Sequence, residues 1–298
     1  MRFGLVGTGY WARATHAAAI ASTPGASLAA VWGRDPQAAA RLAGEHGADA
    51  FTGQEAIDQF LDGVDAVAFS VPPYVQAPIA ARAARAGKHL LLEKPVALAE
   101  AEADALVDAV DAAGVASVVF FTLRFNGEIR AWLTDENARG GWSGNGWSGG
   151  HSEWIGSIFA PGSPFNTPWR REKGGLWDVG PHVLSLLWAS LGPVVGVTAV
   201  RGAGDLTHLV LAHESGASST ATVTLGAPPA ASATNLYVWG EAGRSVMPNS
   251  GWDPVECLRT ALTELLAMAA AGEVRHPCDV RFGRDIGRVL AAAQAQLD

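Results

Sequence analysis

Residues 2–12 read RFGLVGTGYWA, an apolar run that passes directly into a glycine-rich turn. Gly7 and Gly9 match the first two glycines of the pattern G-x-G-x-x-G/A, and Ala12 takes the third place. The first glycine permits a tight turn, the second lets the backbone approach a pyrophosphate, and the small third residue lets a helix pack on the strand. The stretch therefore predicts a dinucleotide-binding strand–turn–helix unit. The alternative is an ordinary turn whose glycines serve geometry alone.

The segments after this turn alternate between short apolar runs and alanine-rich stretches with helical spacing. The apolar runs are 2–6, 28–32, 66–71, 89–93 and 117–121, and the alanine-rich stretches are 10–22, 36–46, 74–86 and 98–113. This alternation is typical of βαβ units, and continuous apolar runs are typical of parallel strands buried on both faces. The pattern predicts an α/β fold with a Rossmann-type, doubly wound parallel sheet.

The pattern changes after Phe125. Residues 140–151 are rich in glycine and predict a loop, and a helix is predicted from Gly180 to about Leu191. Alternating segments then predict strands at 194–201, 206–213, 218–225, 234–240 and 244–247, and two helices follow at 255–271 and 283–297. We therefore predict a dinucleotide-binding domain over 1–123 and, over 124–298, an α+β domain with an open, mainly antiparallel sheet. The second domain would bind substrate and form oligomers.

Composition narrows the class of protein. The 298 residues are 49% hydrophobic and 17% charged, which favours a folded core over disorder. A net charge of -8 argues against partners such as nucleic acid or an anionic membrane surface. Only two cysteines are present, so we expect a reducing, cytoplasmic setting, with a single Cys257–Cys278 disulfide as the minor alternative. We also expect neither a signal peptide nor a membrane-spanning segment.

The end of the second apolar run bears on the choice of cofactor. Residues 31–36 read VWGRDP, and Gly33 stands where a protein that prefers NAD usually places an acidic residue for the ribose hydroxyls. Without that carboxylate, a 2′-phosphate would not be repelled, and Arg34 could pair with it. Arg41, further along the predicted helix, would add to this positive field, whereas Asp35 fits either the acidic position or a helix N-cap. The stretch favours NADP, with NAD as the alternative.

Two further stretches carry ionisable groups that point to chemistry. Residues 89–98 read HLLLEKPVAL, which places Lys94 at the carboxyl end of a strand, where ligands of doubly wound sheets bind. Residues 176–182 read LWDVGPH, which places Asp178 and His182 four apart in an apolar helix start, on one face. From these residues alone, a buried Asp–His pair that caps the helix is an equal alternative. No third ligand with convincing spacing accompanies them, so no metal site is predicted.

Five stretches resemble one known family. They are GTGYWARATHAAAI (7–20), AARAARAGKHLLLEKPVAL (80–98), FTLRFNGEIRAW (121–132), PWRREKGGLWDVGPHVLSLLWASLGP (168–193) and DVRFGRDIGRVL (279–290). The E-K-P and D-x-G-x-H motifs, in this order, resemble the glucose–fructose oxidoreductase, inositol dehydrogenase and rhizopine catabolism family (Gfo/Idh/MocA). The resemblance covers nearly the whole chain.

The resemblance implies roles for the matching residues. Lys94, Asp178 and His182 would surround the reacting carbon, with His182 as the general base, Asp178 orienting the imidazole or binding a substrate hydroxyl, and Lys94 bonding the developing alkoxide. Trp169 and Arg170 would border the nicotinamide or the substrate. The candidate cofactor-binding residues are Gly7, Thr8, Gly9, Tyr10, Trp11, Gly33, Arg34, Val71, Pro72, Glu93, Lys94, Trp169 and Arg170.

The sequence departs from the family pattern at three positions. Gln76 stands where histidine is common, Ser185 replaces an acidic residue, and Gly127 stands where proline usually follows R-F-N. These departures bear on the substrate, because pocket walls set specificity. Other candidates for the site wall are Tyr74, Trp142, Trp147 and Trp154, whereas Trp188 is predicted to lie in the core. For any one tryptophan, core or interface is favoured over sugar stacking.

The expected function is hydride transfer between nicotinamide and a polyol, sugar or sugar-like carbonyl. One alternative is a regulatory protein that binds a dinucleotide or sugar without catalysis, although such a protein has no need of the Lys–Asp–His trio. Another is redox-assisted elimination or glycoside cleavage with a retained cofactor. Because the alternating segments 206–213 and 218–225 permit an apolar outer sheet face, we also expect a homodimer or homotetramer.

Overall fold

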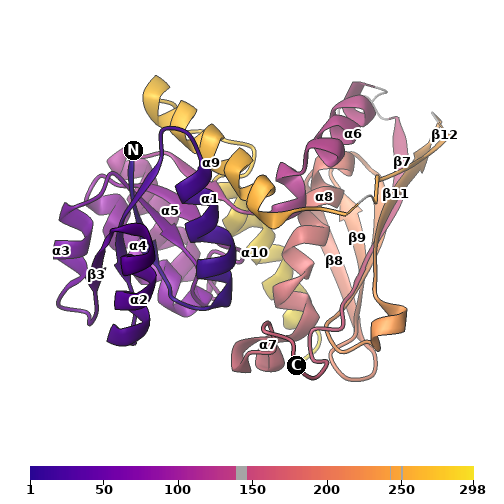
Figure 1. The fold of residues 1–298 in the computed structure, drawn as a ribbon. Coiled ribbons are helices and arrows are strands. Elements are labelled where there is room, and N and C mark those ends of the chain that lie inside the picture. The colour runs from indigo at the N-terminus through magenta and orange to yellow at the C-terminus, as the bar shows by residue number, and fades with distance from the viewer. Residues whose placement is uncertain (139–145, 242, 250) are drawn as a thin grey trace. The chain divides into compact units, whose positions relative to one another are not determined.

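A computed structural model describes residues 1–138, 146–241, 243–249 and 251–298 of the chain. The chain forms two compact units (Figure 1). The first comprises Met1–Phe125 and Asp253–Asp285, and the second comprises Asn126–Trp252 and Ile286–Asp298. The division after Phe125 lies close to the predicted boundary at 123. The predicted second domain, 124–298, nevertheless differs from the structure, because residues 253–285 return to the first unit.

The first unit is built on a six-stranded parallel sheet in the order β3-β2-β1-β4-β5-β6. Its strands are β1 (Arg2–Val6), β2 (Ser27–Trp32), β3 (Asp49–Phe51), β4 (Ala66–Phe69), β5 (His89–Leu92) and β6 (Ser117–Val119). The central strand β4 and the edge strand β6 are buried at every position, as expected for strands covered on both faces. This arrangement confirms the doubly wound α/β fold. The short edge strand β3 was not among the predicted runs.

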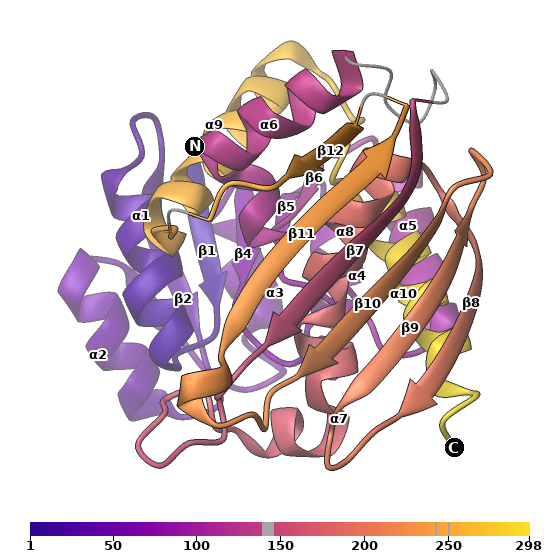
Figure 2. The ribbon, with the colours of Figure 1, turned by 90° about the vertical axis from the view of Figure 1, so that its right-hand side faces the viewer.

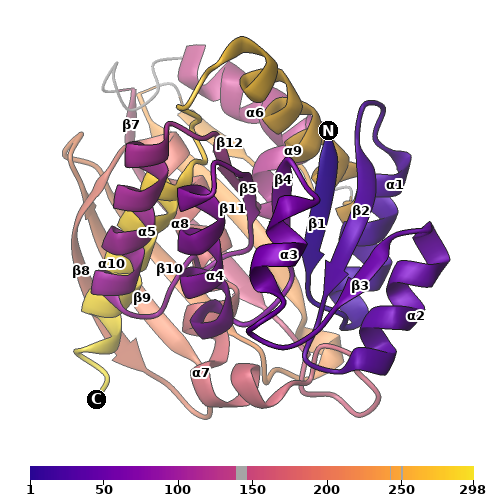
Figure 3. The ribbon, with the colours of Figure 1, turned by 90° about the vertical axis from the view of Figure 1, so that its left-hand side faces the viewer.

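Helices cover both faces of this sheet. They are η1 (Ala12–Ala17, π-helical), α1 (Ala18–Ser22), α2 (Pro36–His46), α3 (Ile57–Asp62), α4 (Pro73–Arg85), α5 (Glu100–Ala113), η2 (Thr122–Phe125) and α9 (Pro254–Ala271). In Figure 3, α4 and α5 lie beside each other on one face, and α1 and α9 lie beside each other on the other. Their alanines allow close packing on the sheet, and Ala80, Ala83 and Ala84 of α4 are fully buried.

The second unit is built on a six-stranded sheet in the order β12-β11-β7-β10-β9-β8 (Figure 2). Its strands are β7 (Trp147–Ile155), β8 (Val194–Arg201), β9 (Thr207–His213), β10 (Ser218–Thr224), β11 (Ala233–Gly240) and β12 (Gly243–Val246). Neighbouring strands are antiparallel except β7 and β10, which are parallel. The sheet is therefore mixed and mostly antiparallel, which confirms the predicted fold class.

The prediction of a loop over 140–151 is wrong for its second half. Residues 147–155 form the central strand β7, whereas 139–145, including Trp142, lie outside the described residues. The glycines in this strand serve packing. A side chain at Gly149 would run into the ring of Trp239, and one at Gly150 would meet Leu191 at 3.0 Å. Close packing, invisible in a composition count, therefore explains Gly149 and Gly150.

The helices of the second unit lie against this sheet or in its connections. They are α6 (Gly127–Ala138), α7 (Pro168–Asp178), α8 (Gly180–Leu191) and the short η3 (Pro229–Ala231). The last helix, α10 (Val280–Gln294), crosses the division between the units at Asp285. Helix α8 packs on β7 and β10, and nearly all of its residues are buried.

The two cysteines were expected to be reduced, with a disulfide as the minor alternative. Cys257 and Cys278 are both buried and free, so the minor alternative of a disulfide between them is wrong. Burial raises the pKa of the Cys257 thiol to about 11, which leaves it in the unreactive protonated form at neutral pH. None of the helices in the described part of the chain is long and apolar enough to cross a membrane.

Candidate active site

The glycine-rich turn after β1 has the shape that a pyrophosphate site requires. Gly7 has a φ of 128°, and a side chain there would run into the carbonyl oxygen of Ser70. A Cβ on Gly9 would meet no described atom within 4 Å. The turn therefore packs tightly against the protein at Gly7 and leaves free space beside Gly9. Backbone N–H groups at the following helix start suit an anionic phosphate, so these residues fit a dinucleotide.

The residues that would select the cofactor follow β2. A Cβ on Gly33 would stand 2.6 Å from the methyl group of Thr8, so a larger residue at this position would require the Thr8 side chain to shift. Asp35 caps α2, with its Oδ1 atom accepting from the backbone N–H groups of Gln37 (2.9 Å) and Ala38 (3.1 Å). This confirms the N-cap interpretation of Asp35. The side chain of Arg34 is exposed.

Lys94 follows β5 directly, at the carboxyl end of the parallel sheet. The Lys94–Pro95 peptide bond is cis. The neighbouring β4 ends at Phe69, so that Val71 and Pro72 lie at the same edge of the sheet. Parallel strands end together, and this edge is where doubly wound sheets bind ligands. Lys94 belongs to the first unit, whereas Asp178 and His182 belong to the second.

Asp178 and His182 lie on two successive helices. Asp178 is the last residue of α7, Val179 lies between the helices, and His182 is in the first turn of α8. The prediction that one helix start carries both groups is therefore wrong. The two helices meet at Val179, and Pro181, which has no N–H to donate, lies in the first turn of α8. Gly174, with φ 63° and ψ −166°, makes a separate kink inside α7, before both groups.

Both ionisable groups are buried and held by neighbours from the second unit. Asp178 is 3% exposed, and its Oδ2 atom accepts from Nε of Arg170 at 2.8 Å. His182 is 5% exposed, and its ring stacks on Trp154 with centroids 5.0 Å apart. The ring of Trp252 meets the ring of Trp154 edge-on, with the two centroids 5.6 Å apart. The imidazole is thus oriented by an aromatic wall, and the carboxylate by a guanidinium.

The carboxylate of Asp205, in the turn between β8 and β9, holds the part of α7 that leads to Asp178. The Oδ2 atom of Asp205 accepts from the backbone N–H groups of Gly175 (2.9 Å) and Leu225 (2.7 Å). Its Oδ1 atom accepts from Oγ1 of Thr224 (2.7 Å) and from the N–H of Gly226 (3.1 Å). A Cβ on Gly175 would stand 2.8 Å from the backbone nitrogen of Thr224. Asp205 therefore clamps the kinked segment of α7 against β10.

The remaining residues singled out in the sequence take different places in the structure. Trp147 is 3% exposed and belongs to the core, whereas Trp188 is half-buried, contrary to the prediction that it lies in the core. Tyr74 is 52% exposed in the first turn of α4. Trp169 lies in the first turn of α7, beside the guanidinium of Arg170. Ser185 donates to the carbonyl oxygen of His182 at 2.8 Å, within α8.

The structure adds four residues that the sequence analysis did not assign to the site. Trp252 and Asp205 support the second unit, and His16 and Gln76 contact the E-K-P turn in the first. Gln76 was noted only as a departure from a family pattern. His16 was the one histidine inside the first apolar helix, and its partner, 77 residues further on, is visible only in the folded chain.

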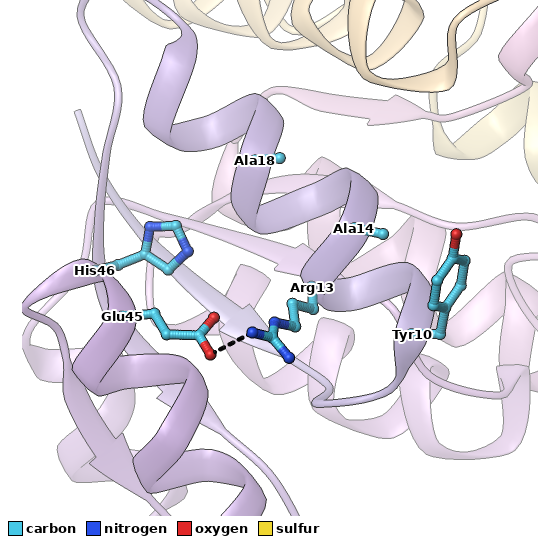
Figure 4. Close-up of a pocket in the computed structure, with 6 residues that line it drawn as sticks. All are labelled: Tyr10, Arg13, Ala14, Ala18, Glu45 and His46. Carbon is cyan, nitrogen blue, oxygen red and sulfur yellow. Dashed lines mark ion pairs between the residues drawn. The ribbon is translucent and has the colours of Figure 1, made fainter.

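A shallow hollow of about 430 Å³ lies beside the first helix (Figure 4). It is lined by Tyr10, Arg13, Ala14, Ala18, Glu45 and His46. Arg13 and Glu45 form an ion pair of 2.7 Å across it, and both are well exposed. Exposed ion pairs of this kind contribute at most about 1 kcal/mol to stability. We therefore assign no ligand to the hollow. Tyr10, a predicted cofactor residue, lies at this surface and is 56% exposed.

Comparison with known proteins finds a family match for the first part of the chain. Residues 1–121 match the model of the oxidoreductase family with an NAD-binding Rossmann fold, GFO_IDH_MocA. Inositol 2-dehydrogenase of Rhizobium meliloti is 34% identical over 131 residues, which are 44% of this chain and 39% of that protein. The chain matches about a third to two fifths of the length of the first four curated relatives.

Two comparisons extend over the rest of the chain. A dTDP-3,4-didehydro-2,6-dideoxy-alpha-D-glucose 3-reductase of Streptomyces violaceoruber is 27% identical over 86% of this chain and 76% of its own. The solved structure of levoglucosan dehydrogenase in complex with NADH and levoglucosan is similar in fold, with a TM-score of 0.84. The likeness covers 99% of this chain and 96% of that one, at 19% identity. Residues 1–121 thus match the Gfo/Idh/MocA oxidoreductase family, and the chain shares its fold with levoglucosan dehydrogenase over nearly its whole length.

Proposed function

We propose that this protein transfers hydride between a nicotinamide cofactor and a polyol, sugar or sugar-like carbonyl substrate. The observation that carries the proposal is the buried helix junction at Asp178 and His182, in a chain whose first 121 residues match an NAD-binding oxidoreductase family. The names of the relatives support the substrate class, because they describe dehydrogenases and reductases of inositol and of sugar nucleotides.

In this proposal, the nicotinamide supplies the hydride acceptor or donor. His182 removes the hydroxyl proton of the alcohol substrate, a task suited to an imidazole because its ordinary pKa lies near neutrality. The Trp154 ring restricts the rotation of that imidazole. Lys94 donates a hydrogen bond to the substrate oxygen as negative charge develops there. Asp178, anchored by Arg170, orients the imidazole or accepts from a neighbouring substrate hydroxyl.

For the cofactor we propose the turn Gly7–Thr8–Gly9 with Tyr10 at the pyrophosphate, and Val71, Pro72 and Lys94 toward the nicotinamide. We propose NADP as the preferred form. Gly33 carries no acidic side chain and packs closely on Thr8, Asp35 is engaged as a helix cap, and Arg34 is exposed nearby. NAD is the competing outcome.

Binding of NADPH and NADH, followed by energy transfer from tryptophan to the reduced nicotinamide, tests this choice. We expect NADPH to bind more tightly, and Arg34→Ala to weaken NADPH binding by roughly ten- to a hundredfold through loss of a charge-assisted hydrogen bond, with little effect on NADH. Arg85→Ala, which removes an exposed guanidinium from α4, is the matched control. Equal affinities in the wild type would refute the NADP preference, and binding of neither nucleotide would refute the proposed function.

We also propose that the protein forms a homodimer or homotetramer through the outer face of the second sheet (Figure 2). This face exposes Val200, Val210, Trp239 and Val246. It is not purely apolar, because His151 and Thr220 are hydrogen-bonded across it at 2.8 Å. Large exposed hydrophobic side chains among paired polar groups are typical of an association surface.

Light scattering at micromolar concentration tests the assembly. We expect a mass of two or four chains, and we expect Val210→Glu to shift the mass toward that of one chain, because it buries a carboxylate in the interface. Arg85→Ala, on a helix of the first unit, makes the same change of −1 in net charge and serves as the control. A wild-type monomer would contradict this part of the proposal.

The proposed setting is the reducing cytoplasm, which is consistent with two buried, free cysteines. No metal is assigned a role. Within the described ranges, no group of three or more His, Cys, Asp or Glu side chains is arranged to hold one. We propose neither a nucleic-acid nor a membrane partner, since the net charge is -8 and spread along the sequence.

A further inference from the structure

The helix that follows the phosphate-binding turn begins with a π-helical segment, η1, over Ala12–Ala17. In an α-helix, residues five apart project about 140° from each other, because each residue turns the chain by about 100°. A π-helix is wound more widely, with hydrogen bonds between residues i and i+5, so that side chains five residues apart project more nearly to the same side. Trp11 and His16 have this spacing. The π-helical segment therefore turns both side chains toward the same neighbour.

That neighbour is the carboxylate of Glu93, the first residue of the E-K-P motif. The indole Nε1 of Trp11 donates to Oε1 of Glu93 at 2.6 Å, and Nε2 of His16 lies 3.0 Å from the same oxygen. His16 is fully buried and Glu93 is 9% exposed. Since a carboxylate oxygen only accepts, both ring nitrogens serve as donors. One buried oxygen thus receives two donors from the first helix.

The other side of Glu93 holds the turn that carries Lys94. Its Oε2 atom accepts from the backbone N–H of Lys94 at 3.2 Å. Behind the turn, the fully buried side chain of Gln76 accepts from the N–H of Glu93 (2.8 Å) and donates to the carbonyl oxygens of Glu93 (2.8 Å) and Val96 (3.2 Å). The backbone around Lys94 is therefore fixed from both sides by buried polar side chains.

We propose that Glu93 is a positioning residue that couples cofactor binding to the placement of Lys94. The carboxylate links the helix start that would hold the pyrophosphate, through Trp11 and His16, to the backbone of Lys94. Trp11 and Glu93, expected from the sequence to touch the cofactor, act instead through each other on the reacting end of the site. This inference rests on the proposed function.

The coupling has a plain physical basis. Hydrogen bonds to a buried carboxylate are short and strong, because the surroundings have a low dielectric constant. When a phosphate orders the turn at Gly9 and the start of the helix, Trp11 and His16 lose freedom. Glu93 then loses freedom too, and less ordering remains to be done at Lys94. Exchange of backbone amides with deuterium reports such local ordering directly, whether or not the protein turns over a substrate.

The test uses adenosine 5′-diphosphate, with and without a 2′-phosphate, as the probe. This fragment reaches the pyrophosphate position but carries neither nicotinamide nor its ribose, so it would not contact Lys94. In the wild type we expect slower deuterium exchange both at residues 7–12 and at residues 93–97. Glu93→Gln keeps the shape of the side chain but replaces one carboxylate oxygen with an NH2 group. That group cannot accept the hydrogen bond from the N–H of Lys94. We expect about tenfold faster exchange at residues 93–97 in the free variant, and no slowing there by the nucleotide.

Glu45→Gln is the matched control. Glu45 also contacts the first helix, through Arg13, but on the exposed side shown in Figure 4, so we expect wild-type behaviour. The coupling would be overturned if the nucleotide still protects residues 93–97 in Glu93→Gln. It would also be overturned if, in the wild type, the nucleotide protects residues 7–12 but not residues 93–97. Absence of protection at 7–12 in the wild type would instead remove the proposed function, and the coupling with it. Should Glu93→Gln fail to fold, His16→Leu provides the same comparison.

Kinetics supply a second readout. If Glu93 positions Lys94, Glu93→Gln lowers kcat at least tenfold and leaves KM for the nicotinamide cofactor within about twofold, because the variant leaves the phosphate-binding turn intact. A direct contact between Glu93 and the cofactor would instead raise that KM. An unchanged kcat with a raised KM would therefore return Glu93 to the role expected from the sequence.

Discussion

His182→Asn is expected to lower kcat by roughly a hundredfold or more, because asparagine cannot take up the hydroxyl proton that the proposed general base removes. Asparagine is close to histidine in size and polarity, so the stacking surface of Trp154 and the buried site should persist. Steady-state rates on a panel of polyols and sugars, with saturating cofactor, give the comparison.

Two companion measurements make this result specific. Cofactor affinity should stay within about twofold of the wild type, since His182 belongs to the second unit and the dinucleotide turn to the first. His46→Asn, which changes a histidine in the last turn of α2, should leave kcat unchanged. Near-normal turnover in His182→Asn would remove His182 from the mechanism. A wild type that binds the nucleotide but oxidises or reduces no sugar or polyol would favour a regulatory protein, or a reaction with retained cofactor.

Asp205→Ala is expected to destabilise the second unit by about 3 kcal/mol, although Asp205 touches neither Asp178 nor His182. The substitution leaves the N–H groups of Gly175 and Leu225 without their acceptor and removes the bond to Thr224. The thermal midpoint should fall by roughly 6–12 °C. The substitution should also lower kcat, because the kinked part of α7 that ends at Asp178 would lose its hydrogen bond to Asp205.

Thermal unfolding monitored by circular dichroism, with rates on the same substrate panel, tests this role. Asp205→Asn retains one acceptor oxygen and should lie between the wild type and Asp205→Ala. Glu214→Ala removes an exposed carboxylate from the next hairpin of the same sheet and should unfold like the wild type. A wild-type midpoint for Asp205→Ala would show that the four hydrogen bonds contribute nothing net to stability.

Elements with complete local signals were predicted with their correct bounds. Helix α2 begins after the cap Asp35 and at Pro36, and it ends before Gly47, whose φ of 65° suits only a glycine cap. The predicted helix from Gly180 to Leu191 and the predicted strand 194–201 also match α8 and β8. In these segments, start signals, stop signals and periodicity all agree within a few residues of chain.

Elements without such agreement were missed. Strand β3 has three residues and lies at a sheet edge, where little is buried. Strand β7 contains Gly149 and Gly150, which are poor strand formers and are required by packing from Trp239 and Leu191. Helix α7 is kinked at Gly174 and clamped by Asp205, which lies 30 residues from Gly175 in sequence. Each of these depends on a partner distant along the chain.

The sequence by itself determined the parallel α/β half, the position of the dinucleotide turn and the identity of the candidate groups Lys94, Asp178 and His182. Those features follow from periodicity, glycine geometry and motif spacing, all of which are local. Only the tertiary structure decided what holds these groups: Trp11, His16 and Gln76 around the E-K-P turn, Arg170 on Asp178, and Trp154 on His182. The reason is that a hydrogen bond or ring contact depends on distance in space. The chain must fold before residues 8 to 82 positions apart become neighbours.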